Sequence, residues 1–281
     1  MLFYAEVADR LRAVNIDSNK APCIGVFDSG VGGLSILRAL HQRLADTSMV
    51  YVGDVAHAPY GERSVSEVIA RSMRIVEWLA SQGAQMIVIA CNTATVLAIE
   101  ALRARWPTLV FVGVEPGVKP AASRSRTQRI AVLVTSATAT SERLRHLIGR
   151  YAAGAHVHVQ ACPGLADAIE RGMLDGPALL EVLRPHCDAV LAADVDTVVL
   201  GCTHYPFVEE SIRALLGTGI TLIDTASAIA DRAASLWEQT PRVFEQAPRV
   251  RAMSTGARET MRLLLQRCPG VEDIEVETLE A

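Results

Sequence analysis

The chain has 281 residues and a net charge of −4, and half of its residues are apolar while 21% are charged. This length suits one large domain or two of ordinary size. The sequence contains no basic block, which argues against a nucleic-acid surface or an anchor to an anionic membrane. No apolar run approaches the roughly 20 residues that cross a bilayer, and the first fifteen residues lack the pattern of a signal peptide. We therefore expect a soluble, cytoplasmic protein.

Short apolar runs alternate with amphipathic stretches along the chain. The predicted strands are 23–27, 49–53, 86–90, 109–114, 130–134, 155–160, 196–200 and 220–223. The predicted helices lie near 34–45, 64–82, 95–105, 141–150, 164–172, 177–193, 207–216 and 226–238, and MRLLLQRC at 261–268 predicts a late helix that packs on the first half. Nearly continuous apolar strands between helices predict an α/β fold whose parallel sheet is covered on both faces.

Two strand motifs recur in the second half of the sequence. The pairs are IGVFDS at 24–29 with IAVLVTS at 130–136, and MIVIACNTAT at 86–95 with TVVLGCTHYP at 197–206. The repeat predicts two pseudosymmetric α/β domains with an active site between them, at the carboxyl ends of their strands. We expect residues 1–115 plus 226–281 to form the first, discontinuous domain and residues 116–225 to form the second.

Two of the six cysteines, Cys91 and Cys202, follow predicted buried strands and precede hydroxyl or amide side chains. Unpaired N–H groups at the start of a helix favour a thiolate, so we expect a reactive pair with one thiol from each half. The alternative is that each cysteine is a small buried hydrophobe. The other four cysteines show no CxxC or zinc-finger spacing, and we interpret them as structural: Cys23, Cys162, Cys187 and Cys268.

A glycine-rich turn follows the first predicted strand and opens a helix. Such a turn lets a ligand approach the backbone, and the helix start favours an anion such as a carboxylate. Ser35 replaces the last glycine of the dinucleotide fingerprint, although Asp54 does occupy the place of a ribose-binding acid. Asp28 and Ser29 at the strand end therefore fit better as contacts of a small polar ligand than as part of a nucleotide site.

The lysine content argues against two further kinds of cofactor site. Lys20 and Lys119 are the chain's two lysines. Neither lies in the sequence context of a pyridoxal Schiff base or of a phosphate-binding Walker loop. We expect no cofactor.

Several polar residues lie in loops whose role the pattern leaves open. The Pro59-Tyr60-Gly61 segment is either a plain turn or a cover that Tyr60 closes over a ligand. Ser136, Thr138 and Ser141 form a hydroxyl-rich turn that suits helix capping as well as ligand contact. Glu170 lies on a predicted helix and, taken alone, is typical of a solvated charge.

Together these motifs resemble those of the glutamate racemases, cofactor-independent isomerases that supply D-glutamate for peptidoglycan. The matching segments, in family order from about residue 24 to 232, are FDSGVGGLSILRAL, YVGDVAHAPYGERS, IVIACNTAT, VGVEPGVKPA, SATATSE, ACPGLADAIERG and VVLGCTHYPF. The resemblance implies two domains facing a buried glutamate, with Cys91 and Cys202 as the two acid/base thiols. It implies substrate contacts at Asp28, Ser29, Tyr60, Gly61, Asn92, Thr93, Thr203 and His204. It implies supporting groups around the cysteines at Asp54, Thr138, Glu170 and His204, and no metal.

Racemisation removes the Cα proton from one face of an amino acid and returns a proton to the other. Two thiols on opposite faces do this without moving, one as thiolate and one as thiol. Without pyridoxal, hydrogen-bond donors on the substrate carboxylate must stabilise the carbanion, and Ser29, Asn92 and Thr93 are suitable. His204 either orients or acidifies Cys202 or is a satisfied core histidine. Asp28 either assists near Cys91 or meets the substrate ammonium group.

Two other functions remain open. One is a racemase of aspartate or of a hydantoin, because pocket size decides the substrate. The other is a thiol-based metal-binding or regulatory module that uses Cys91, Cys202 and His204, although this spacing is unusual for a structural zinc site. We expect a small-molecule substrate, no nucleic-acid or membrane partner, and a homodimer as an open possibility.

Overall fold

The computed structural model describes residues 22–240 and 247–280, so the amino-terminal segment that we compared with signal peptides lies outside the described residues. The strands are β1 (Cys23–Asp28), β2 (Met49–Gly53), β3 (Ala84–Ile89), β4 (Val110–Gly113), β5 (Arg129–Val134), β6 (His156–Ala161), β7 (Thr197–Leu200), β8 (Thr221–Ile223), β9 (Val250–Ser254) and β10 (Val276–Thr278). The α-helices are α2 (Leu34–Arg43), α3 (Val65–Ser81), α4 (Asn92–Arg105), α5 (Val118–Arg124), α6 (Ser136–Ala139), α7 (Glu142–Tyr151), α8 (Leu165–Glu170), α9 (Gly176–Ala192), α10 (Glu209–Leu216), α11 (Ala226–Trp237) and α12 (Glu259–Leu265). Short 3₁₀ helices are η1 (Val55–His57), η2 (Tyr60–Glu62) and η3 (Tyr205–Val208).

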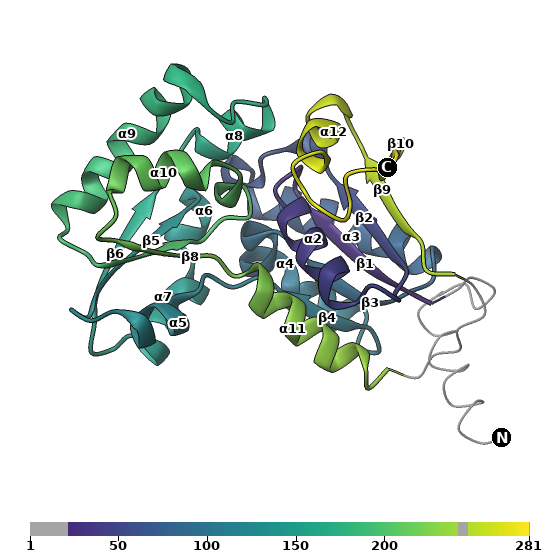
Figure 1. The fold of residues 1–281 in the computed structure, drawn as a ribbon. Helices are drawn as coiled ribbons and strands as arrows, with labels where there is room; N and C mark the ends of the chain where they lie inside the picture. The colour runs from purple at the N-terminus through teal and green to yellow at the C-terminus, as the bar shows by residue number, and fades with distance from the viewer. Residues whose placement is uncertain (1–21, 241–246, 281) are drawn as a thin grey trace.

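The described residues form two sheets in which neighbouring strands are parallel throughout. The larger sheet has the order β10-β9-β2-β1-β3-β4, and the smaller has the order β6-β5-β7-β8. Figure 1 shows each sheet in its own lobe with helices around it. The predicted α/β class, with two mainly parallel sheets flanked by helices, is confirmed.

The two sheets share one strand order. In the larger sheet β1 lies between β2 and β3, and β4 lies beyond β3. In the smaller sheet β5 lies between β6 and β7, and β8 lies beyond β7. The strands of the sequence repeat hold equivalent places, because β1 corresponds to β5 and β3 to β7. The helices that follow these paired strands cover opposite faces of each sheet, which opens a crevice between the strand ends where ligands bind in such folds.

Buried side chains of each strand point alternately to the two faces of the sheet, and each face packs against its own layer of helices. In β1, Ile24 and Val26 pack with α2 and α11, whereas Phe27 packs with α3 and α4. In β5, Leu133 packs on the side of α9 and α10, whereas Val132 packs with α5 and α7. Burial of each such side chain contributes roughly 1.5–3 kcal/mol to folding.

Some elements differ from those predicted. Helix α4 begins at Asn92 and not near 95, and the predicted helix at 207–216 is the 3₁₀ turn η3 followed by α10. Strands β9 and β10 and helices α5 and α6 were not predicted. Arg251 in β9 pairs with Glu277 in β10 (Nη2–Oε2, 3.0 Å), so these two strands carry charges that break the apolar pattern in the sequence.

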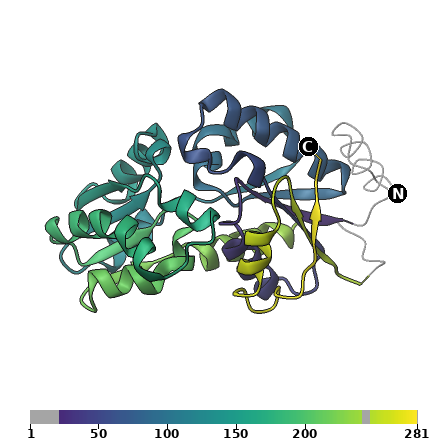
Figure 2. The same cartoon turned by 90° about the horizontal axis from the view of Figure 1, so that it is seen from above.

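The carboxy-terminal segment completes the first lobe. The predicted late helix is present as α12, and its Met261 side chain lies against Gly53 of β2. Figure 2 shows this segment, in yellow, beside the purple amino-terminal elements. Helix α11 packs on α2, whereas α5 packs with α7. The division into residues 1–115 plus 226–281 and residues 116–225 stays a prediction. Within the described residues, no helix is both long enough and apolar enough to cross a membrane.

Candidate active site

A small cavity lies where the strand ends of the two lobes meet. It receives residues from the loops after β1, β2, β3, β5, β6 and β7. The lining residues are Ser29, Pro59, Tyr60, Gly61, Cys91, Asn92, Thr93, Thr135, Ala166, Cys202, Thr203 and His204. The cavity volume is about 10 Å³, room for about one water molecule. The repeat therefore brings both predicted thiols to one small cavity.

Cys91 is the N-cap residue of α4. Its Sγ accepts a hydrogen bond from the Ala94 N–H at 3.3 Å and lies 3.7 Å from the Ser29 hydroxyl. We expected the start of the helix to favour the thiolate, but burial raises the pKa of Cys91 well above its ordinary value, and the nearby Asp28 carboxylate raises it further. The helix N–H lowers the pKa only in part, so in the resting protein Cys91 is held as the thiol.

Asp28 lies near the Cys91 thiol and is fully buried. It accepts hydrogen bonds from the Gly30 N–H at 2.8 Å and from the Thr203 hydroxyl of the other lobe at 2.9 Å. Burial raises the pKa of Asp28 to about 6, against the lowering effect of His204. Asp28 does not line the cavity, so its contact with a ligand stays a prediction, whereas its place near Cys91 is clear.

Cys202 has a different setting from Cys91. It is followed by a turn, in which the Tyr205 N–H donates to the Cys202 carbonyl at 3.1 Å, and not by the α-helix that we expected. The Nδ1 atom of His204 lies 3.5 Å from the Cys202 sulfur. An imidazole therefore takes the place that helix N–H groups have beside Cys91.

His204 is held by a carboxylate on its far side. Its Nε2 lies 2.6 Å from Glu170 Oε1, which also accepts the Val31 N–H of the other lobe at 2.8 Å. Burial alone would lower the pKa of His204, but its hydrogen bonds to Cys202 and Glu170 outweigh burial and raise it well above the ordinary value. The Glu170 side chain is only 8% exposed, which corrects the interpretation of Glu170 as a solvated charge.

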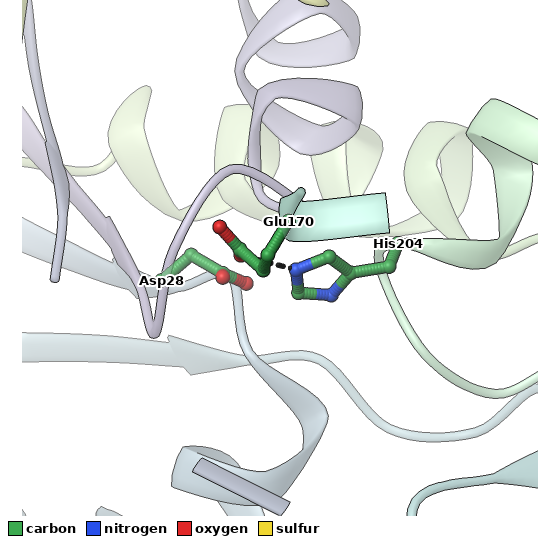
Figure 3. A group of neighbouring side chains, drawn as sticks. All are labelled: Asp28, Glu170 and His204. Atoms are coloured by element: carbon green, nitrogen blue, oxygen red, sulfur yellow. Dashed lines mark hydrogen bonds and ion pairs between the residues drawn. The ribbon is translucent and has the colours of Figure 1, made fainter. Parts of the chain in front are cut away.

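Figure 3 shows Asp28, Glu170 and His204 converging from the two lobes. Their potential ligand atoms lie within 4.8 Å of one another, as in a cation site. However, Glu170 already binds the His204 ring and the Val31 N–H, and a cation would have to break these contacts. We therefore interpret the cluster as a proton-sharing network. It contains neither cysteine, so it is not the metal set of Cys91, Cys202 and His204 considered from the sequence.

Asp54 is occupied by protein groups and cannot bind a ribose. Arg71 donates to it from Nε at 2.9 Å and from Nη2 at 2.8 Å. The Tyr60 hydroxyl donates to Asp54 Oδ2 at 2.6 Å and Thr255 donates to Oδ1 at 2.8 Å. These donors, Arg71 above all, lower the pKa of Asp54 against the effect of burial. Tyr60 lines the cavity with Gly61, but its hydroxyl is directed to Asp54 and not over a ligand.

Threonine hydroxyls from both lobes meet at the cavity. Thr93 Oγ1 lies 3.0 Å from Thr135 Oγ1, which in turn donates to Thr138 Oγ1 at 3.1 Å. Thr138 is fully buried and does not line the cavity, which fits a supporting role. The Asn92 amide donates to the Val114 carbonyl at 3.3 Å, so one of its donors is engaged.

Thr135 and Ala166 line the cavity but were not predicted as site residues. Thr135 was within reach of sequence reasoning, because it follows β5 as Ser29 follows β1 in the repeat. Arg71, the partner of Asp54, lies in α3, and no motif or repeat in the sequence marks it as a site residue. The predicted roles of the individual residues stay predictions, but the cavity brings together Ser29, Tyr60, Gly61, Cys91, Asn92, Thr93, Cys202, Thr203 and His204.

The fold and the cavity define a class of protein. It is a two-lobed parallel α/β protein with one thiol from each lobe at a shared polar cavity, an arrangement that suits proton transfer at both faces of a small ligand. A family profile described as Asp/Glu/Hydantoin racemase matches residues 24–233, most of the chain. The chain belongs to the Asp/Glu/hydantoin racemase family.

Known proteins of this family share most of the chain. A glutamate racemase of Ectopseudomonas mendocina (strain ymp) is 45% identical over 212 residues, which cover 75% of this chain and 80% of that protein. The structure of a glutamate racemase isoform from Bacillus anthracis matches with a TM-score of 0.83 and 31% identity, covering 93% of this chain and 98% of the other. Escherichia coli glutamate racemase, solved with L-glutamate and the activator UDP-MurNAc-ala, matches with a TM-score of 0.80 and 32% identity, covering 92% and 98%. The resemblance predicted from the motifs is confirmed.

Proposed function

We propose that the chain is a cofactor-independent glutamate racemase that interconverts L- and D-glutamate by proton transfer at Cα. The observation that carries the proposal is that Cys91 and Cys202, one from each lobe, line the same cavity. The similarity to glutamate racemases over most of the chain supports the substrate. Supply of D-glutamate for peptidoglycan is the use that fits this activity.

In the proposed reaction, each thiol serves one face of the substrate. A thiolate removes the Cα proton, and the opposite thiol donates its own proton to the other face of the carbanion. The two cysteines finish the turnover with their protonation states exchanged. The reverse reaction starts from that state, so neither thiol has to move around the substrate.

The carbanion needs strong stabilisation because a thiolate is a far weaker base than the Cα carbanion that it must generate. The donors at the cavity are suited to the substrate carboxylate, since Ser29, Thr93 and Thr135 place hydroxyls around it and α4 begins there. These donors would draw negative charge toward the carboxylate in the transition state. The Ser29 and Thr135 hydroxyls now donate to Asp28 and Thr138 and would have to turn toward the substrate. Asn92 keeps one amide N–H free, because its other N–H binds the Val114 carbonyl.

Each thiol also has its own ionisable neighbour. Asp28 lies near Cys91, and its raised pKa lets it take up a proton near pH 6. The His204–Glu170 pair touches Cys202 from the other side. In this proposal Asp28 and the His204–Glu170 pair adjust the acidity of the two thiols, and only the sulfur atoms exchange a proton with the substrate.

Circular dichroism tests the proposal directly. Protein freed of metal and pyridoxal is given L-glutamate and, separately, D-glutamate, and the signal at one wavelength is followed. The expected result is decay of both signals to a common racemic endpoint. Flat traces with glutamate, but decay with aspartate or a hydantoin, would assign the other substrates that we considered. Flat traces with all of them, for folded protein with reduced thiols, would refute the racemase function.

The same preparation tests the alternative of a metal-binding regulatory module. That alternative requires a stoichiometric metal, such as zinc, that survives dialysis of the protein as purified. The proposed racemase instead keeps full activity after treatment with a chelator. A cytoplasmic location and a homodimer stay predictions, and light scattering of the purified chain tests the second of these.

A further inference from the structure

Tyr205, three residues after Cys202, has a buried hydroxyl group with no role in the reaction proposed for the two thiols. The residue begins η3 and is fully buried. Its N–H donates to the Cys202 carbonyl, so its backbone is tied to the strand end that carries the thiol. Among the described residues its hydroxyl oxygen has no partner in full hydrogen-bond geometry. A buried hydroxyl without a partner is destabilising, so such a group in a native fold calls for an explanation.

The groups that this hydroxyl approaches are two thiols. It interacts with the side chains of Cys162 and Cys202. Cys162 follows β6, and its thiol is directed to the Gln160 carbonyl at 3.6 Å. A neutral thiol is a weak acceptor, whereas a thiolate is a strong one. The hydroxyl therefore lacks a good acceptor only while both cysteines are protonated.

We propose that Tyr205 is a positioning residue for racemisation, whose hydroxyl donates a hydrogen bond to the Cys202 sulfur whenever that sulfur is a thiolate. This inference rests on the proposed two-thiol function, because Cys202 becomes a thiolate in one half of the cycle. Cys162 does not line the cavity, so in the proposed reaction it does not exchange a proton with substrate. Of the two thiols near the hydroxyl, only Cys202 is then expected to become charged.

The hydrogen bond would make the two thiols more alike. Cys91 has the Ala94 N–H and the Ser29 hydroxyl as neighbours, while Cys202 has His204 Nδ1 at 3.5 Å. With Tyr205, Cys202 has two groups able to donate to it, as Cys91 has once the Ser29 hydroxyl turns from Asp28. A reaction that runs in both directions through both thiolates requires such stabilisation on each side. The other ionisable groups near Cys202 are Cys91, Cys162 and, through the imidazole, Glu170.

The test is Tyr205→Phe, which removes the hydroxyl and keeps the ring. The pH dependence of Cys202 alkylation by iodoacetamide is measured by mass spectrometry in a Cys91→Ala background, and kcat is measured with Cys91 intact. Loss of a donor to a charged sulfur should move the pH of half-maximal alkylation up by about one unit and lower kcat about tenfold. The matched control is Cys162→Ala, which removes the other thiol near the hydroxyl and should move the pH of half-maximal alkylation by less than about 0.3 unit and change kcat less than about twofold.

Unchanged alkylation and unchanged kcat in Tyr205→Phe would overturn the inference. Equal effects of Tyr205→Phe and Cys162→Ala on the alkylation pH and on kcat would also overturn it, because the hydroxyl would then act through Cys162. If Tyr205→Phe does not fold, replacing the tyrosines by 3-fluorotyrosine makes the phenol a stronger donor and should move Cys202 alkylation to lower pH. An unchanged pH of half-maximal alkylation would again overturn the hydrogen bond.

The two proposals can fail separately. If this pH shifts in a chain that does not racemise glutamate, the proposed function is refuted and the hydrogen bond stands. If the chain is active and this pH does not shift, the hydrogen bond alone is refuted.

Discussion

At the scale of single residues, the two thiols differ in charge environment although the chain places them alike. Cys91 faces the Asp28 carboxylate, which disfavours a second negative charge. Cys202 faces the imidazole of His204, which the Glu170 carboxylate helps to keep protonated. The resting protein therefore combines a thiol at Cys91 with a cation beside Cys202. The proposed reaction needs this asymmetry, since one sulfur must be base while the other is acid.

Removing either sulfur should stop the reaction. Cys91→Ala and Cys202→Ala leave one face of Cα without an acid or base, so we expect kcat for racemisation to fall at least about 10³-fold in each. Circular dichroism with both enantiomers measures the loss. Cys187→Ala, in a buried position on α9 away from the cavity, is the matched control and should keep near-normal kcat. Near-normal turnover in either active-site variant would refute the two-thiol reaction.

Asp28 should make stability depend on pH. Its pKa is raised from 3.8 to about 6 by burial, so between these values the folded chain binds more protons than the unfolded chain. Stability from this group is fully present below about pH 3.8 and is lost as the pH rises through about 6. Relative to Asp28→Asn, the unfolding free energy of the wild type should fall by on the order of 3 kcal/mol between pH 4 and 7. Urea unfolding of both proteins measures this difference, and a difference that stays constant with pH would contradict the assignment.

At the scale of elements, the glycine turn after β1 lets the second lobe approach. A Cβ at Gly32 would lie 2.5 Å from His204 Nδ1 and 2.7 Å from Thr203 Oγ1. We therefore expect Gly32→Ala to push the imidazole away from Cys202 and to lower kcat about tenfold or more while the chain still folds. The control is Gly149→Ala in α7, where an added Cβ meets nothing within 4 Å. Activity equal to the control in Gly32→Ala would show that the close approach is not needed.

Helix α3 covers one face of the first sheet without touching the cavity. Its N-cap Ser64 and Glu67 form a reciprocal capping box. Ser64→Ala should lower the free energy of unfolding by about 1 kcal/mol, measured by urea unfolding, and leave kcat unchanged. Ser235→Ala, at an exposed position within α11, serves as the comparison. A loss no larger than that of Ser235→Ala would mean that the cap contributes little.

The parts of the fold that the sequence predicts are those with a strong local pattern. Buried strands such as β1 and β3 read as apolar runs, and the repeat predicts that their ends meet at one site. Strands β9 and β10 were missed because the Arg251–Glu277 pair interrupts their short apolar pattern. The burial of Glu170 is visible only in three dimensions, since its partners His204 and Val31 are distant in the chain.

At the scale of the whole molecule, the lobes are closed on each other. Contacts that cross between them include the Thr203–Asp28 and Val31–Glu170 hydrogen bonds and the Arg143–Glu100 ion pair. The cavity, about 10 Å³, is too small for glutamate, so we expect the lobes to separate when glutamate enters. We expect small-angle X-ray scattering to give a larger radius of gyration for the free chain than for the chain saturated with glutamate. Identical radii would mean that the substrate enters without movement of the lobes.

The most direct test of the two-thiol reaction is proton exchange in D₂O. L-Glutamate is incubated with the protein, and at early times NMR measures deuterium at Cα in the remaining L-glutamate and in the D-glutamate formed. With separate thiols on the two faces, the product takes its hydrogen from a thiol that has exchanged with solvent, while the abstracted proton returns only to its own face. The expected result is fully deuterated D-glutamate beside unlabelled L-glutamate, and the mirror result from D-glutamate. Product that keeps the original proton, or equal labelling of both enantiomers from the start, would contradict the proposal that Cys91 and Cys202 act as separate acid and base.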